Sequence, residues 1–170
     1  MYRVDTLIRL TATYALYAVA LVAAVSWLRS PRRAKAPYAV AAVLAAGLVG
    51  VLVKVAGTAW TDPRPFVVDH STPLIAHSVD NGFPSDHTAL AAAIALVVLA
   101  WHRRTGVLLL LLAAVLGASR VLAGVHHVPD VAAGYAVGIL AGGVAVLVSR
   151  ALPWPRIEAR VPLLGRARAT

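Results

Sequence analysis

The sequence predicts an all-α membrane protein, a polytopic bundle of about five transmembrane helices with one long extracytoplasmic loop. Of its 170 residues, 60% are hydrophobic and only 14% are charged, and the mean hydropathy is +0.78. A soluble domain carries about 25% charged residues. Long Ala, Leu and Val runs also occur in buried helices of soluble proteins, but several runs near the length of a bilayer crossing favour the membrane.

The apolar runs reach, or nearly reach, the roughly 17–25 residues that a bilayer crossing needs. Each is expected to be helical, because lipid offers no partner for a free backbone N–H or C=O group. The expected spans are Leu7–Leu28, Pro37–Trp60, Ser85–Trp101, Gly106–Leu122 and Val131–Val148. Together they make one transmembrane domain over residues 1–152, followed by a basic cytoplasmic tail over residues 153–170.

The first span has basic residues on both sides: Arg3 and Arg9 near its start, and a cluster from Arg29 to Lys35 after its end. An alternative is a cleaved signal peptide, since small residues around Ser26 resemble a cleavage site. The apolar stretch is long for a signal peptide, and the basic cluster behind it is typical of a stop-transfer flank. We interpret the segment as a membrane span.

The second and third spans are separated by a loop from Thr61 to Pro84, which is longer than a simple connection needs. Pro84 and Ser85, at the start of the third span, are common helix-start residues. A helix start offers free N–H groups and the positive end of the helix dipole, which suit a phosphate oxygen. This loop and helix start are therefore candidates for function.

The fifth span carries glycines on one face. Gly134, Gly138 and Gly142 are spaced four residues apart, which places them in one row along the helix. Small residues in such a row let a neighbouring helix approach closely. We interpret these glycines as packing residues.

Basic residues follow spans one, three and five, at Arg29–Lys35, at His102–Arg104 and from Arg150 onward. By the positive-inside rule these three connections are cytoplasmic. The long loop and the turn between spans four and five are then extracytoplasmic, with the N-terminus outside and the C-terminus inside. Arg3 and Arg9 would lie outside against the rule, but the cluster after the first span outnumbers them. We expect a bacterial-type cytoplasmic membrane.

Composition also limits the function classes. Cysteine is absent, which excludes disulfides, thiolate nucleophiles and Cys-based metal sites. The net charge of +9 could indicate nucleic-acid binding, but the basic residues lie beside apolar segments, as membrane orientation requires. No HExxH-type spacing supports a zinc site, so we expect no metal and no other cofactor. The histidines that could in principle form one are His70, His77, His126 and His127.

Ionisable residues cluster at three places, Asp62–Phe66, Phe83–His87 and Ser119–Asp130. Charged groups beside membrane segments are costly, so by default they indicate a functional site. A single His or Arg at a helix end is more often a cap or an interfacial anchor. That interpretation does not explain why all three groups fall on one predicted face. We therefore expect one active site there.

The residue types in these clusters suit phosphoryl transfer. The guanidinium groups of Arg64 and Arg120 match pairs of phosphate oxygens. His126 and Asp130 are four residues apart; if the helix start reaches back to His126, Asp130 can hold one imidazole nitrogen and leave the other free to attack phosphorus. His87, in the first turn of the third span, is then placed to protonate the leaving oxygen.

These motifs resemble the type-2 phosphatidic acid phosphatase superfamily of integral membrane lipid phosphatases. Its signature is Lys-x6-Arg-Pro, Pro-Ser-Gly-His and Ser-Arg-x5-His-x3-Asp. The third part matches completely at Ser119–Asp130, the second matches at Pro84–His87 with Asp in place of Gly, and Arg64-Pro65 matches the end of the first. The segments are most similar to the bacitracin-resistance-type undecaprenyl-diphosphate phosphatases within this superfamily.

The resemblance implies a metal-independent enzyme that works through a phosphohistidine. His126 would be the nucleophile, Asp130 its orienting partner and His87 the general acid. The phosphate-binding residues that it implies are Arg64, Arg120, Ser85 and, at a shifted position, Lys54.

Two positions depart from the family pattern. Its spacing places the lysine at Gly57, whereas Lys54 lies one helical turn deeper, a drop of about 4.5 Å that a Lys side chain can span. Asp86 puts a carboxylate beside the phosphate, so we expect it to point away, onto an Arg or a loop N–H. The family commonly has six spans and this sequence shows five; the missing one would be the first.

The leading hypothesis is hydrolysis of undecaprenyl diphosphate, or a related lipid phosphate, at the outer leaflet. Phosphatidic acid, phosphatidylglycerol phosphate and a polyprenyl-phosphate sugar phosphate are alternative substrates, and transfer of the phosphoryl group to an acceptor hydroxyl is an alternative reaction. A non-enzymatic alternative is a transporter or assembly subunit that only binds lipid. The expected partners are the lipid phosphate substrate and membrane lipids, without nucleic acid; the sequence predicts no oligomeric state.

Overall fold

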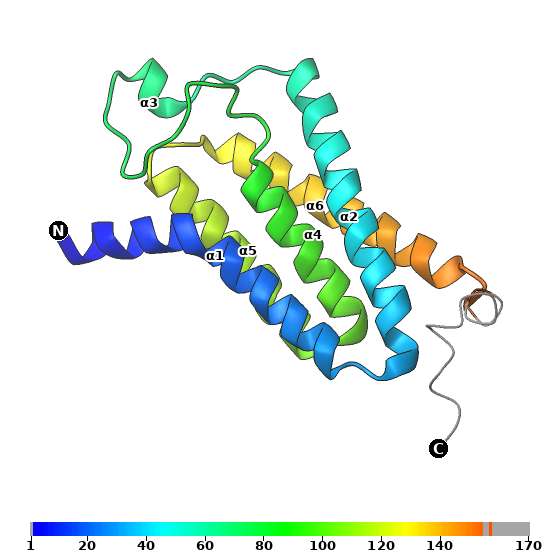
Figure 1. Ribbon diagram of the computed structural model, residues 1–170. Coiled ribbons are helices and arrows are strands. Elements are labelled where there is room, and N and C mark those ends of the chain that lie inside the picture. Colours follow the sequence, from blue (N-terminus) through cyan, green and yellow to red (C-terminus); the bar gives the residue numbers. More distant parts are fainter. Residues whose placement is uncertain (1, 155–156, 158–170) are drawn as a thin grey trace.

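The computed structural model describes residues 2–154 and 157, and in this part the chain is a bundle of long helices (Figure 1). The helices are α1 (Tyr2–Arg29), α2 (Arg32–Ala59), α3 (Pro65–Val68), α4 (Asp86–Trp101), α5 (Arg103–Leu122) and α6 (Val128–Ala151). The predicted all-α membrane bundle is confirmed. Most of the expected basic tail, Arg156 included, lies outside the described residues.

Each predicted span coincides with one helix. The helices α1, α2, α5 and α6 begin three to five residues before the apolar run, whereas α4 begins at Asp86, one residue after the predicted start. For example, α2 begins at Arg32, directly after Pro31, whereas the apolar run begins at Pro37. Hydropathy marks the part of a helix that suits lipid, while the helix itself continues until a residue interrupts its hydrogen bonds. The basic connection that we expected at His102–Arg104 is shorter than predicted, because α5 already begins at Arg103.

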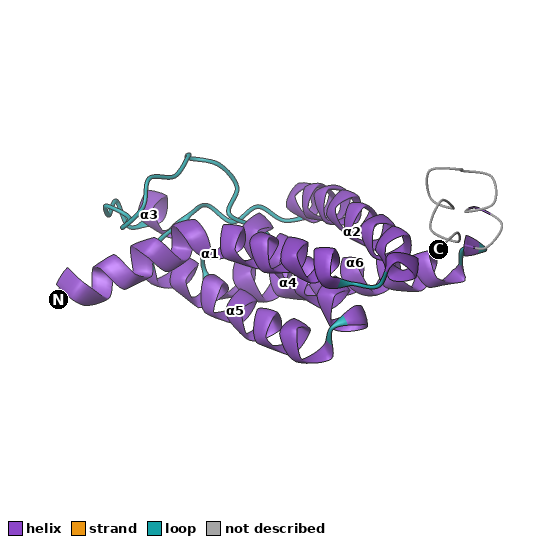
Figure 2. Ribbon diagram, turned by 60° about the horizontal axis from the view of Figure 1, so that its bottom comes forward, coloured by secondary structure: helices purple, strands orange, loops and turns teal. Residues whose placement is uncertain are grey.

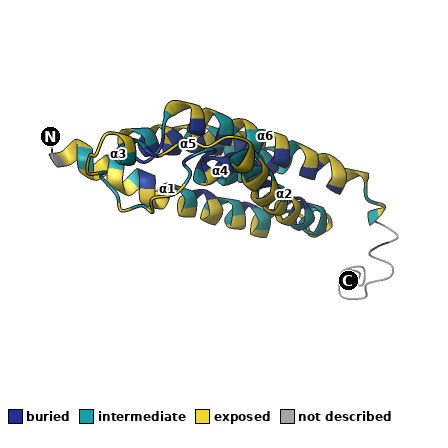
Figure 3. Cartoon of the chain, turned by 90° about the horizontal axis from the view of Figure 1, so that it is seen from above, coloured by how far each residue is buried: buried dark blue, intermediate teal, exposed yellow. Residues whose placement is uncertain are grey.

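Four helices, α1, α2, α5 and α6, are long and apolar enough to cross a membrane, so the chain is a multi-pass membrane protein. The 16-residue α4 is about 24 Å long, shorter than the hydrocarbon core of about 30 Å. It packs against α1, α2, α5 and α6 and lies among them in Figure 3. Its alanines at 89, 91, 92, 93 and 95 are fully buried. A helix enclosed by its neighbours has little contact with lipid and does not need to match its thickness.

The glycine row on α6 is a packing surface, as predicted, and its partner is α4. A Cβ at Gly134 would meet the carbonyl oxygen of Ser85, and one at Gly138 would meet that of Ala89. A Cβ at Gly142 would lie 2.9 Å from the carbonyl oxygen of Ala93. Backbone therefore approaches backbone along this whole contact, which only glycine permits.

The two ends of the bundle differ. At one end, which we call the loop end, the long segment between α2 and α4 crosses over the helices together with α3 (Figures 1 and 2). The opposite end, which we call the basic end, has short turns and carries the clusters Arg29–Lys35 and Arg103–Arg104. There His102 contacts Ser30, with 2.8 Å between Nε2 and Oγ, so it lies far from the predicted site, as expected.

The long loop is fixed to the bundle by side-chain and backbone hydrogen bonds. Asn81 donates through Nδ2 to the carbonyl oxygens of Gly57 (2.9 Å) and Trp60 (3.0 Å), and its Oδ1 accepts from the N–H of Asp62 at 2.9 Å. Farther along, the N–H of Leu74 donates to the carbonyl of Ala123 at 2.9 Å. The loop therefore has a defined path, on which the position of the site depends.

Candidate active site

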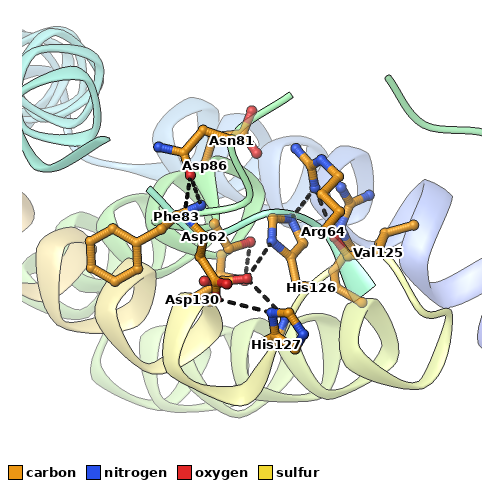
Figure 4. A network of polar contacts seen from close by, with 12 residues as sticks. Asp62, Arg64, Asn81, Phe83, Asp86, Val125, His126, His127 and Asp130 are labelled. Carbon is orange, nitrogen blue, oxygen red and sulfur yellow. Dashed lines mark hydrogen bonds and ion pairs between the residues drawn. The ribbon is translucent and has the colours of Figure 1, made fainter. Parts of the chain in front are cut away.

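Short segments from distant parts of the chain meet at the loop end. Arg64 immediately precedes α3, and His126 and Asp130 lie in the connection to α6 and its first turn (Figure 4). Arg120 lies in the last turn of α5 and His87 in the first turn of α4. The structure therefore brings these five predicted site residues to one end of the bundle.

His126 is buried at the centre of this group, with 1% of its surface exposed. Its Nε2 lies 3.3 Å from Nη1 of Arg64. A guanidinium can only donate hydrogen bonds, so Nε2 must be the unprotonated nitrogen, and the proton is on Nδ1. That nitrogen lies 3.4 Å from Oδ2 of Asp130 (Figure 4). The imidazole thus has a carboxylate behind it and directs its lone pair towards a cation.

The surroundings of His126 keep it neutral. Burial, together with the positive charges of Arg120 and Arg64, lowers the pKa of His126 to about 3. Each of these effects disfavours the imidazolium form. At neutral pH Nε2 is therefore unprotonated, as a nucleophile requires.

Asp130 is fully buried in the first turn of α6. Its Oδ2 accepts a hydrogen bond from the N–H of His127 at 2.8 Å, which fixes the carboxylate beside His126. Its backbone carbonyl accepts the N–H of Ser85 at 3.0 Å. This second bond joins the start of α6 to the start of α4, so the two helix starts hold each other in place.

Arg64 is 4% exposed and is held at two points. Its Nε donates to Oδ1 of Asp80 at 2.6 Å, and its Nη1 donates to the carbonyl oxygen of Val125 at 2.8 Å. Neither contact uses Nη2. The guanidinium is therefore fixed in orientation and keeps donor capacity for an anion.

Arg120 is 3% exposed and incompletely paired. Its Nη2 donates to Nε2 of His77 at 2.9 Å, and its Nη1 reaches the carbonyl oxygen of Ala12 at 3.5 Å. Among the described residues its Nε has no hydrogen-bond partner. Leaving a buried charged donor unpaired is costly, and an anion bound between Arg64 and Arg120 would remove that cost.

The start of α4 presents a second His–Asp pair. Oδ1 of Asp86 accepts from both the backbone N–H of His87 at 2.7 Å and its ring Nδ1 at 2.8 Å. We expected Asp86 to point onto an Arg or a loop N–H; its partners are instead the N–H and the ring of the next residue. Ser85 is fully buried, and its Oγ lies 3.0 Å from Oγ1 of Thr88.

A pocket of about 620 Å³ opens beside this group. It is lined by His77, His87 and Arg120 and by residues of α1 between Arg9 and Tyr17. Two predicted site residues, His87 and Arg120, therefore border one space that a substrate can enter.

Lys54 is the predicted residue that the structure does not bring to the site. It is exposed on α2, and none of the site contacts described above includes it. The family position, Gly57, instead faces the loop, where a Cβ would lie 3.1 Å from the carbonyl oxygen of Phe83. The backbone of the loop occupies the place from which a side chain at position 57 would extend.

Sequence reasoning missed two residues of the loop, His77 and Asp80. Burial and the charges of Arg64 and Arg120 lower the pKa of His77, which matches its role as an acceptor for Arg120. Partial burial alone would raise the pKa of Asp80, but hydrogen bonds from Arg64 and Ser78 outweigh it and lower that pKa. Both residues hold the arginines; the one signal in the sequence was their place inside an unusually long loop.

A second carboxylate lies close to Asp130. Oδ2 of Asp62 is 2.9 Å from Nδ1 of His127. One ligand atom from each of Asp62, His127 and Asp130 lies within 4.8 Å of the others, the arrangement among the described residues that could hold a metal ion. Of the histidines considered for zinc, only His127 belongs to it.

A family model described as PAP2 superfamily matches residues 38–154. The bacitracin transport permease protein BcrC of Bacillus licheniformis is 39% identical over 132 residues, which cover 76% of this chain and 64% of that relative. The undecaprenyl-diphosphatase BcrC of Bacillus subtilis is 32% identical over 139 residues, covering 81% of this chain and 71% of the relative. The crystal structure of Aquifex aeolicus LpxE is similar with a TM-score of 0.70 and 26% identity, over 86% of this chain and 87% of that one.

Proposed function

Because this chain belongs to the PAP2 superfamily, we propose that it is an integral membrane phosphatase that hydrolyses a lipid phosphate through a phosphohistidine on His126. The observation that carries the proposal is the setting of that imidazole. Its Nδ1 faces a buried carboxylate, and its Nε2 faces a guanidinium. This arrangement orients a neutral nucleophile towards the place where a phosphoryl group binds.

In the first step the terminal phosphoryl group binds between Arg64 and Arg120, whose charges offset the negative charge on its oxygens. Nε2 of His126 attacks phosphorus; an N–P bond forms and the P–O bond to the leaving group breaks. His87 donates a proton to the leaving oxygen. Asp130 stabilises the positive charge that develops on the His126 ring.

In the second step His87, now lacking that proton, takes one from a water molecule. The water oxygen attacks phosphorus, the N–P bond breaks and inorganic phosphate leaves. His126 returns to its neutral form and His87 is protonated again, so the cycle is balanced. None of these steps needs a metal or another cofactor.

The remaining phosphate ligands of the proposal differ in position. Ser85 lies at the start of α4 with its hydroxyl already bonded to Thr88, and it would contribute by turning that hydroxyl towards the substrate. Lys54 is exposed one helical turn below Gly57, and it would have to extend upward to contribute.

Undecaprenyl diphosphate is our first choice of substrate, and the name of the Bacillus subtilis relative supports it. The same groups could act on phosphatidic acid, phosphatidylglycerol phosphate or a polyprenyl-phosphate sugar phosphate. We place the loop end on the extracytoplasmic side of a cytoplasmic membrane, with the N-terminus outside and the C-terminus inside, because the basic clusters lie at the opposite end.

Trapping the intermediate tests this proposal. Purified protein is quenched after brief reaction with a lipid diphosphate labelled on its terminal phosphate. We expect acid-labile label on His126, its absence in His126→Ala, its presence in the neighbouring His127→Asn control, inhibition by vanadate and no effect of EDTA. Label that persists in His126→Ala would overturn the assignment. Lipid binding without phosphate release would favour the non-enzymatic alternative.

A further inference from the structure

Helix α1 carries hydrogen-bonding side chains on one face of a membrane-spanning segment. Arg9, Thr13 and Tyr17 are spaced four residues apart, so they form one row, and Tyr14 lies next to it. All four are exposed and line the 620 Å³ pocket of the candidate active site. Polar groups in a spanning helix are costly in hydrocarbon and by default indicate function. Here the polar row faces the pocket.

Arg9 is the charged member of this row, and its position needs an explanation. Among the described residues it has no hydrogen-bond or ion-pair partner. In the proposed topology it lies on the side of the membrane that the positive-inside rule disfavours. An anion bound in the pocket would account for both observations.

The pocket also has more room than one phosphoryl group requires. The group that reacts lies between Arg64 and Arg120, next to His126. The pocket is lined by Arg120 and His87 and also by the row on α1. Beyond Tyr17, α1 borders an apolar groove of about 520 Å³, which is lined by Ala20 and Ala24 and, from α4, by Leu90 and Ile94. Along α1 the pocket lining is therefore charged and polar near Arg9 and apolar beyond Tyr17. A lipid phosphate has the same order, with a charged head group followed by an apolar tail.

We propose that Arg9, with Thr13 and Tyr17, forms a second anion subsite, which binds the tail-side phosphate of a lipid diphosphate. The inference rests on the proposed function and deepens it. The terminal phosphoryl group lies between Arg64 and Arg120, and His87 borders the same pocket, where the bridging oxygen leaves. A lipid monophosphate has no second phosphate and leaves this subsite empty, so the site selects diphosphates.

The test compares farnesyl diphosphate with farnesyl monophosphate, which share one tail and differ by one phosphate. For Arg9→Gln we expect the ratio of kcat/KM for the diphosphate to that for the monophosphate to fall about tenfold, the loss that one charge-assisted hydrogen bond gives. The matched control is Arg3→Gln, the same charge change six residues earlier on α1 at a position outside the pocket, and it keeps the wild-type ratio. Arg9→Lys retains part of the preference, because it keeps the charge and loses the fork.

Two results would overturn the subsite: a wild-type ratio in Arg9→Gln, or an equal loss on both substrates. If the wild-type protein releases phosphate from neither substrate, the proposed function fails, and binding then tests the subsite by itself. By calorimetry we expect Arg9→Gln to weaken inorganic pyrophosphate about tenfold more than orthophosphate. Equal weakening of the two anions, or no binding of pyrophosphate, refutes the subsite.

Discussion

Two His–Asp pairs lie at two helix starts of the candidate site, and their surroundings are opposite. At the start of α6, the side chains of His126 and Asp130 are 1% and 0% exposed, with 3.4 Å between Nδ1 and Oδ2. At the start of α4, the side chains of His87 and Asp86 are 34% and 63% exposed, with 2.8 Å between Nδ1 and Oδ1. The residue types are the same, and burial is what distinguishes the pairs.

This difference indicates how the two imidazoles divide the proposed reaction. The buried ring is kept neutral and apart from water, which suits the atom that attacks phosphorus. The half-exposed ring borders the pocket and can exchange protons with solvent, which suits a group that must give and regain a proton in each cycle. Environment, more than residue type, assigns the roles.

Breaking the buried pair should have the largest effect. We expect His126→Ala to lower kcat for phosphate release from farnesyl diphosphate by at least about 10⁴-fold, because the attacking atom is removed. The control is His70→Asn in the exposed part of the loop, where the backbone φ of 51° is one that Asn tolerates. A loss of less than tenfold in His126→Ala would contradict its role.

Removing His87 from the exposed pair should lower kcat less than removing His126, and the size of the loss should depend on the leaving group. We expect His87→Gln to lower kcat on farnesyl diphosphate by about 10²–10³-fold, the usual contribution of a general acid. The loss should be smaller on p-nitrophenyl phosphate, whose leaving oxygen needs no proton, whereas His126→Ala should lose equally on both. Equal losses for His87→Gln on the two substrates would show that His87 does not protonate the leaving oxygen.

The two carboxylates allow a direct comparison of buried and exposed support. We expect Asp130→Asn to lower kcat about 10²-fold, since buried Asp130 has no water that can replace it. Asp86→Gly, which restores the usual residue of the family motif, should lower kcat only about fivefold, because water can reach His87 in its place. A larger loss of kcat in Asp86→Gly than in Asp130→Asn would mean that burial of the carboxylate does not determine how much it contributes.

The smallest effect concerns pH. The His126 ring should stay neutral from pH 8 to below pH 5, because its pKa is lowered to about 3. The unfolded chain takes up a proton at this residue near its ordinary pKa of about 6.5, which the folded protein excludes. His126 therefore contributes stability that is complete above pH 6.5 and is lost as the pH falls towards 3. Imidazole ¹⁵N shifts measure the titration, and a midpoint near 6.5 would contradict the burial argument.

The sequence could predict those site residues that belong to a motif with fixed spacing, and not those that lie in an irregular loop. The spacing in Ser119–Asp130 predicted that His126 and Asp130 would face each other if the helix reached back to His126. The two side chains do lie 3.4 Å apart, although α6 begins only at Val128 and the connection before it places His126. Hydropathy predicted the spans, since the membrane requires apolar surface. His77 and Asp80 could not be found in this way. The loop has no repeating residue pattern, and its path is set by individual hydrogen bonds such as those of Asn81, which residue spacing does not predict.

The partner of Asp86 and the place of Lys54 show the same limit. A carboxylate beside a phosphate was expected to point onto an Arg or a loop N–H, but its hydrogen-bond partners belong to the next residue, His87. Lys54 was predicted as a phosphate ligand only because it is the lysine nearest to the family position, which is Gly57 here. The shift leaves it one turn below Gly57, and the structure keeps it on the exposed side of α2.

The backbone bond from Ser85 to Asp130 and the contact of Gly134 with Ser85 have a consequence for heat inactivation. This bond and this contact join the two helix starts directly, so we expect His126 and His87 to lose their positions together. Heating that separates α6 from α4 should displace both histidines at the same temperature. A heated sample should therefore contain a mixture of fully active and fully inactive molecules, and the KM of the remaining activity should be unchanged.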